Sequence, residues 1–280
     1  MRTREVTVLG RALRTGQARL GLTLLAMVAL VVAFGPFFAP YAPDAIVGPP
    51  LETPSTRLLL GTDILGRDVL SRLLNGGFAL SWMAVLAAAL GVVLGCVVGL
   101  TAAYRGGGVD AVLMRSMDVL LSFPEIIFVL LFVSMLGRST LLTAVLVGVA
   151  FVPGVSRVMR GAALPVVGSE YVLWAKANGL PLRRLLLREV LPGVTSPLMV
   201  ETGMRLVWAV SAIASLSYLG FGIAPPAADW GRMVGENQDG LPVAPLAVLA
   251  PIALILMMAL GGNLVAESVA RAVGRTEGKV

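Results

Sequence analysis

The sequence contains no histidine, a single cysteine and few charged residues for its length. Of its 280 residues, 14% are charged and 57% are hydrophobic, and the mean hydropathy is +0.89. The lone Cys96 excludes an internal disulfide, and the lack of histidine excludes metal clusters of nitrogen and sulfur ligands as well as serine–histidine–aspartate catalysis. No Gly-x-x-x-x-Gly-Lys-Ser/Thr phosphate loop occurs. We therefore expect an integral membrane protein that binds no metal and does not itself hydrolyse ATP.

Long apolar runs dominate the chain. A bilayer core of roughly 30 Å needs about 20 helical residues. The sequence predicts an all-α polytopic protein with a transmembrane domain over 20–266, between tails at 1–19 and 267–280. Six transmembrane spans are expected at about 20–39, 78–103, 117–136, 140–159, 197–221 and 244–266. Pro153-Gly154 interrupts the fourth, which a span tolerates when neighbouring helices satisfy the freed carbonyl.

The distribution of lysine and arginine predicts the orientation of these spans. With the N-terminus inside, the cytoplasmic segments hold 16 of these residues and the external segments five, and Arg205 falls within the fifth span. This bias predicts that both termini are cytoplasmic. The first apolar run has no small-residue cleavage site, so we expect it to remain as a span. The net charge of +6 lies in loops rather than on one face, which argues against nucleic-acid binding.

Small residues crowd the second span, and Gly91, Gly95 and Gly99 recur at every fourth position. This spacing places the three glycines on one face of a helix, where a neighbouring backbone can approach closely. Tight helix packing is the simpler interpretation, and a glycine-lined substrate path is the alternative.

Two sizeable segments, 40–77 and 222–243, are expected outside the membrane. Prolines open the first and forbid a continuous helix there, and a short interfacial helix is expected from about Asp68. The external segments carry seven acidic residues against five basic ones, so they are candidates for a mouth that receives a docking protein. The acidic residues are Asp44, Glu52, Asp63, Asp68, Asp229, Glu236 and Asp239.

A polar loop over 162–193 separates the fourth and fifth spans. It is expected to form two short helical stretches, Ala162–Gly168 and Glu170–Asn178, broken by Pro165 and Gly168. Small residues at 175, 177 and 179 would let a partner surface come close, and a helix held at the membrane surface can be pushed as a lever. The alternative is a solvated loop whose basic residues only follow the orientation rule.

Four ionisable residues fall within the predicted spans, where charge is costly and functional candidates are therefore sought. They are Asp118, Glu125, Glu201 and Arg205. Glu201 and Arg205 are four residues apart and can face each other on one helix. Any of them could line a translocation path. For Glu201 and Arg205 the simpler interpretation is a mutual pair that extends toward the cytoplasmic face.

The polar loop resembles the EAA loop of ABC-importer permeases, whose coupling helix docks on an ATPase subunit. Glu170, Ala175, Gly179, Leu191 and Pro192 fall on that pattern, and Tyr171 and Ala177 complete the coupling-loop candidates. The external segments resemble the dipeptide/oligopeptide/nickel branch of these permeases. The matching candidate residues there are Gly61, Thr62, Asp63, Gly66, Arg67, Asp68, Arg72, Trp230 and Gly231. Trp174 and Glu189 depart from the loop pattern, and the tail after Leu264 departs from the branch's ending.

This resemblance implies a permease subunit of an ATP-driven importer in a bacterial or archaeal cell membrane. Its partners would be a second homologous permease, two ATPase subunits that bind ATP and magnesium, and an extracellular solute-binding protein. The implied substrate is a di- or oligopeptide, with nickel or another small solute as the alternative. The alternatives from other classes are a self-sufficient secondary transporter and a membrane scaffold without transport. The first would need repeated halves with midplane charges, and the external segments argue against the second.

Overall fold

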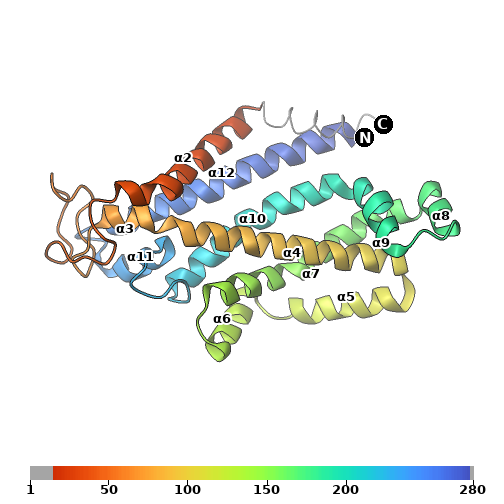
Figure 1. Cartoon of the computed structure of the whole chain (residues 1–280), viewed down its shortest axis with the longest axis horizontal. Coiled ribbons are helices and arrows are strands. Elements are labelled where there is room, and N and C mark those ends of the chain that lie inside the picture. Colours follow the sequence, from red (N-terminus) through yellow and green to blue (C-terminus); the bar gives the residue numbers. More distant parts are fainter. Residues whose placement is uncertain (1–14, 278–280) are drawn as a thin grey trace.

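The computed structural model describes residues 15–277 and places five long helices in one bundle (Figure 1). These helices are α2 (Gly16–Phe38), α4 (Gly77–Arg105), α7 (Thr140–Val167), α10 (Thr195–Tyr218) and α12 (Leu246–Glu277). Within the described residues, five helical segments are long and apolar enough to cross a membrane, or up to six if one bent pair counts as a span. The predicted all-α membrane fold is confirmed.

The third span, expected over 117–136, is not a single helix. It consists of α5 (Gly107–Leu121) and α6 (Glu125–Leu136), which are bent by 81° at the break between them (Figure 1). Pro124 explains the break, because proline lacks an N–H and disfavours helical backbone in the residue before it. The prediction was wrong about the continuity of this segment and about its start.

The glycines of α4 pack directly against α7. A Cβ atom placed on Gly91 would lie 2.6 Å from the Cβ of Phe151, and one on Gly95 would lie 2.5 Å from the Cβ of Val155. Such separations leave no room for a side chain, so glycine is required for this close approach. Tight helix packing, the simpler interpretation of the stripe, is confirmed.

Two boundaries of the predicted polar loop and tail are corrected. Helix α7 continues through both Pro153 and Pro165 to Val167, so residues 162–167 extend the fourth span instead of forming a separate stretch. Helix α12 likewise runs to Glu277, through most of the predicted tail 267–280. Most of the predicted tail 1–19 lies outside the described residues.

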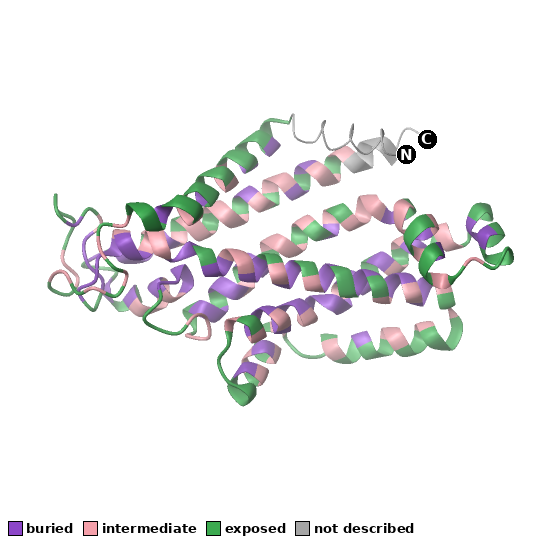
Figure 2. Ribbon diagram, viewed as in Figure 1, coloured by how far each residue is buried: buried purple, intermediate pink, exposed green. Residues whose placement is uncertain are grey.

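The short elements gather at the two ends of the bundle. Helices α3 (Val69–Asn75) and α11 (Trp230–Asn237) lie at one end with the extended segment that follows α2 (Figure 1). At the other end lie α8 (Glu170–Ala177), α9 (Leu182–Leu185), and the turn between α4 and α5 (Figure 1). A π-helical turn (Leu186–Val190), a 3-10 turn (Leu191–Val194) and a second 3-10 turn (Gln238–Gly240) complete the elements. Figure 2 shows α5 and α8 largely exposed and the region around α3 buried.

The close α4–α7 contact predicts that a side chain added at the contact destabilises the protein more than one added at an open position. Gly95→Leu should lower the free energy of unfolding by about 1–3 kcal/mol, because overpacking forces the two helices apart. Gly161→Leu is the matched control, since a Cβ on Gly161 of α7 meets nothing within 4 Å. Unfolding of both variants in detergent measures the difference, and equal losses would contradict this account of the stripe.

Candidate functional site

At the α3–α11 end, a buried ion network joins two segments that are far apart in the sequence. The Asp63 carboxylate accepts hydrogen bonds from Arg67 Nε at 2.6 Å and from Arg72 at 2.5 Å. The Glu236 carboxylate of α11 accepts from the same two arginines at 2.8 and 3.0 Å, and from Arg232 Nε at 2.6 Å. Asp63 and Arg72 are 0% and 1% exposed. The network therefore ties the 61–72 segment to α11 through charges withdrawn from water.

The other external candidates also have internal partners. Thr62 donates to Pro49 O at 2.6 Å, Asp68 caps α3 by accepting from Ser71 N at 2.8 Å, and Trp230 Nε1 donates to Leu73 O at 2.7 Å. Gly61 adopts a φ of +75°, a backbone conformation that favours glycine. Gly66 shares that conformation, and Gly231 packs so closely against α10 that a Cβ would lie 2.4 Å from Ala214 O.

This burial changes the expected acidic mouth. Asp63, Asp68 and Asp229 are buried and engaged within the chain, whereas Asp44 and Asp239 remain exposed. All nine candidates in these two segments are thus interior residues, and Gly61 and Gly66 are also needed for their backbone shape. Their effect on any docking protein would come from the surface shape that they hold together, because few of their atoms are accessible for direct contact.

At the opposite end, α8 is seated on the bundle by Val172 and Ala175, both buried in an apolar cluster with Leu185 and Val190. Gly179 ends the helix at φ +72°. Its N–H donates to Lys176 O at 3.0 Å, and the next N–H, of Leu180, donates to Ala175 O at 3.2 Å. These two bonds form a Schellman motif, which explains why glycine stands here.

The exposed face of α8 differs from the predicted one. Ala175 is 4% exposed and belongs to the seat, so the small residues that remain accessible are Ala177 and Gly179. Trp174 is 70% exposed and is flanked by half-exposed Tyr171 and Leu173. From the sequence alone, Trp174 is only a departure from a motif. The sequence feature that indicates its exposure is the helical spacing, which places this large aromatic residue on a different face from Val172 and Ala175.

The remaining coupling-loop candidates lie beside this helix. Glu170 begins α8 and is exposed, and Leu191 and Pro192 are half-buried in the 3-10 turn that leads into α10. Lys176 lies 5.2 Å from the centroid of the Tyr104 ring at the end of α4, which helps to hold α8 against the bundle.

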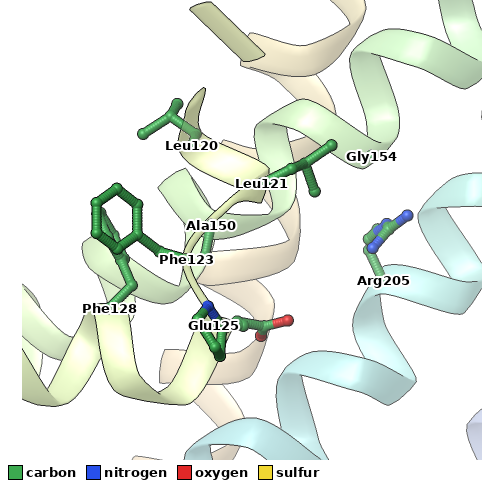
Figure 3. Close-up of a pocket in the computed structure, with 9 residues that line it drawn as sticks. Leu120, Leu121, Phe123, Glu125, Phe128, Ala150, Gly154 and Arg205 are labelled. Atoms are coloured by element: carbon green, nitrogen blue, oxygen red, sulfur yellow. The ribbon is translucent and has the colours of Figure 1, made fainter. Parts of the chain in front are cut away.

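Between the α5–α6 bend, α7 and α10 lies a cavity of about 310 Å³ (Figure 3). Its walls are mostly apolar, and it contains two of the predicted intramembrane charges, Glu125 and Arg205. The complete lining is Leu120, Leu121, Phe123, Pro124, Glu125, Phe128, Ala150, Gly154 and Arg205. An apolar pocket with two convergent charged groups can bind a small charged solute.

The other two intramembrane candidates have different positions. Glu201 pairs with Arg205, whose Nε lies 2.6 Å from the Glu201 carboxylate, as the four-residue spacing predicts. Asp118 lies outside the cavity lining and pairs with Arg157 of α7 at 2.5 Å, with both side chains about half-exposed. The structure therefore brings Glu125 and Arg205 together at the cavity, with Glu201 behind Arg205, and separates Asp118 from them.

Comparison with known proteins identifies the family of the chain. Residues 91–276 match the family described as the binding-protein-dependent transport system inner membrane component. The chain belongs to this family. Members are permease subunits and not ATPases, and this permease is a multi-pass protein of the cell membrane.

Individual relatives cover most of the permease. It is 30% identical over 254 residues to the di/tripeptide transport system permease protein DppC of Pseudomonas aeruginosa, covering 88% of this chain and 84% of the relative. It is 33% identical over 216 residues to the glutathione transport system permease protein GsiD of Pectobacterium atrosepticum, covering 77% and 72%. A chain of the MetNI methionine ABC transporter, solved in inward-facing conformations, shares the fold at 17% identity. The TM-score is 0.54, and the aligned region covers 71% of this chain and 96% of the MetNI chain.

The ion network at the α3–α11 end predicts a large penalty for removing one arginine. Arg72→Gln should lower the free energy of unfolding by about 3–5 kcal/mol, because it leaves the buried Asp63 without full compensation. Arg57→Gln is the control, since Arg57 is an exposed arginine of the same segment between α2 and α3, with one long hydrogen bond, of 3.4 Å, to Tyr41. The free energy of unfolding of both variants is measured in detergent. Equal losses in the two variants would contradict the stabilising role of the network.

The network also predicts a pH dependence that belongs to Glu236. Burial raises the pKa of Glu236, but the hydrogen bond from Arg232 and the charges of Arg72 and Arg67 outweigh it, and the pKa lies below its usual value. Its stabilisation is therefore complete above the unfolded pKa of about 4.3 and is lost as the pH falls through the lowered folded pKa.

Comparison with Glu236→Gln isolates this effect. The excess stability of the wild type over the variant should shrink as the pH falls below about 4. Thermal unfolding across the acidic range measures it. Because burial raises the pKa of Asp229 in both proteins, its opposite pH dependence cancels in the difference. A difference that stays constant with pH would contradict this assignment.

Proposed function

We propose that this permease forms half of the membrane channel of an ATP-driven importer of short peptides. The observation that supports it most directly is α8, a short helix seated by buried residues at the end of the bundle with Trp174 and its neighbours exposed. Exposed aromatics around a rigid helix are typical of protein-binding hot spots. In a permease family whose members lack their own ATPase, the partner proposed for this face is an ATPase subunit.

The complete assembly would contain two ATPase subunits, a second homologous permease and an extracellular solute-binding protein. ATP and magnesium would bind to the ATPase subunits. Both termini and α8 would be cytoplasmic, as the excess of lysine and arginine on that side favours. The end formed by α3 and α11 would then be external and would face the loaded binding protein.

Peptides are the proposed substrate because two of the relatives are named for di/tripeptide and glutathione transport. Nickel is less well supported, since the described residues hold no group of three histidine, cysteine or acidic side chains able to bind a metal ion. The cavity, with one carboxylate and one guanidinium among apolar walls, suits a small charged organic solute better.

Gly179 provides a sharp test of the proposed coupling. Gly179→Val should weaken retention of the ATPase subunits about tenfold or more, because a branched side chain at φ +72° costs more than about 1 kcal/mol and distorts the end of α8. Gly168→Val is the matched control in the same loop, since Gly168 has a helical φ of −79° and no close neighbour. Co-purification in mild detergent and ATPase activity of the retained material are the measurements.

Two results would overturn the proposal. In one, the tagged chain elutes without ATPase subunits yet transports dipeptide when reconstituted alone, which would indicate a secondary transporter. In the other, ATPase retention and dipeptide uptake are the same in Gly179→Val as in the wild type, which would remove α8 from the coupling surface.

A further inference from the structure

The cavity contains one charged group that no other part of the described chain satisfies. Glu125, the first residue of α6, lines the cavity half-buried, and its carboxylate has neither a hydrogen bond nor an ion pair among the described residues. An unpaired charge withdrawn from water is costly, and in a membrane protein it marks a functional position. Since the described residues supply no hydrogen-bond or ion-pair partner, the carboxylate is available to a ligand.

Arg205 does not provide that partner. Its Nε and NH2 atoms lie 2.6 and 2.5 Å from Glu201 Oε1, so the guanidinium is committed to a carboxylate on its own helix. It is further placed over the Phe151 ring, 5.5 Å from the centroid. Gly154 leaves space for it, because a Cβ there would lie 2.9 Å from the Arg205 NH2 atom. Arg205 is thus held in place at the cavity wall.

The charges around the cavity leave an excess of one negative charge. Glu201 neutralises Arg205, and Glu125 remains. Burial makes the charge of Glu125 costly, and the positive end of the α6 dipole and the nearby guanidinium offset part of that cost. The site therefore attracts a cation.

The chemistry of the walls indicates which cation. The described residues hold no group of three metal-ligating side chains, and Leu120, Phe123 and Phe128 give the cavity an apolar lining that does not suit a hydrated metal ion. An ammonium group attached to a carbon skeleton suits it better, since nitrogen can donate to the carboxylate while carbon contacts the wall. A volume of about 310 Å³ is at the small end of the roughly 300–1,000 Å³ range of ligand pockets.

We infer that Glu125 receives the α-ammonium group of a short peptide in the translocation path, while the first side chain of the peptide contacts the apolar wall. Arg205 has more N–H donors than Glu201 uses, and the first peptide carbonyl is the acceptor within reach of them. This inference rests on the proposed function, and it assigns the cavity a preference for a free N-terminus. Figure 3 shows Glu125 and Arg205 entering the same space from α6 and α10.

Protection of an introduced cysteine tests the inference without the selectivity of a binding protein. Ala150 lines the cavity, and the native Cys96 is buried, so Ala150→Cys in a Cys96→Ala background reports on occupancy. The permease complex, with cysteine-free partner subunits, is labelled with a methanethiosulfonate reagent in the presence of Ala-Ala or N-acetyl-Ala-Ala. Mass spectrometry measures modification of the introduced cysteine.

Ala-Ala should slow labelling, and N-acetyl-Ala-Ala, which lacks the ammonium group, should not. Glu125→Gln should raise the Ala-Ala concentration for half protection about tenfold or more, as expected for losing a hydrogen bond to a charged group. Glu125→Asp should preserve protection. Glu267→Gln is the control, because Glu267 is half-exposed on α12, lies outside the cavity lining and pairs with Arg271.

Equal protection by the two peptides, or unchanged protection in Glu125→Gln, would overturn the inference. If Glu125→Gln fails to assemble, the comparison of the two peptides on the wild-type carboxylate still decides it. Uptake of Ala-Ala into proteoliposomes with the binding protein tests the proposed function separately from the role of Glu125. If the complex imports peptide but protection of the introduced cysteine is the same in Glu125→Gln as in the wild type, the inference is refuted and the proposed function stands. A complex that imports no peptide would refute the proposed function.

Discussion

The close contact between α4 and α7 is the constraint on which the rest of the permease depends. In a bilayer, apolar helices gain little from leaving lipid, so their association relies on close packing that small residues permit. Gly91, Gly95 and Gly99 provide it by removing the side chains that would hold α7 away. Helix α7 contributes Ala150 and Gly154 to the cavity at its middle and leads to α8 at its end. One helix contact therefore positions both the cavity and the exposed helix.

The permease treats its charges differently along its length. At the α3–α11 end, arginines and carboxylates are buried together and satisfy each other, which fixes segments that are distant in the sequence. At the cavity, Glu201 pairs with Arg205 on the same helix, and no described residue forms a hydrogen bond or ion pair with Glu125. At the α8 end, the most exposed large hydrophobic side chain of the helix is aromatic, that of Trp174. Groups satisfied within the chain serve its structure, and those left unsatisfied are available to bind.

Much of the architecture follows from the sequence, because bilayer thickness fixes how long an apolar run must be. The prediction of the third span as one helix is wrong because hydropathy reflects composition and not the direction of the helix axis. Pro124 is the residue that indicates the bend. Helix α8 was expected, but its buried face was not, since only the folded chain shows that Ala175 packs against Leu185 and Val190. The burial of Asp63 is equally absent from the sequence pattern, because Glu236, which shares the partners Arg67 and Arg72 with Asp63, lies far along the chain.

The most direct test of this account is photo-crosslinking from α8 in the intact assembly. A benzophenone amino acid at position 174 should crosslink to an ATPase subunit, because that side chain is 70% exposed on the face proposed to dock. The same probe at position 208, where the native tryptophan is 59% exposed on α10, should give no such product. Crosslinks to the ATPase from position 208 and none from position 174 would contradict the assignment of α8 as the coupling helix.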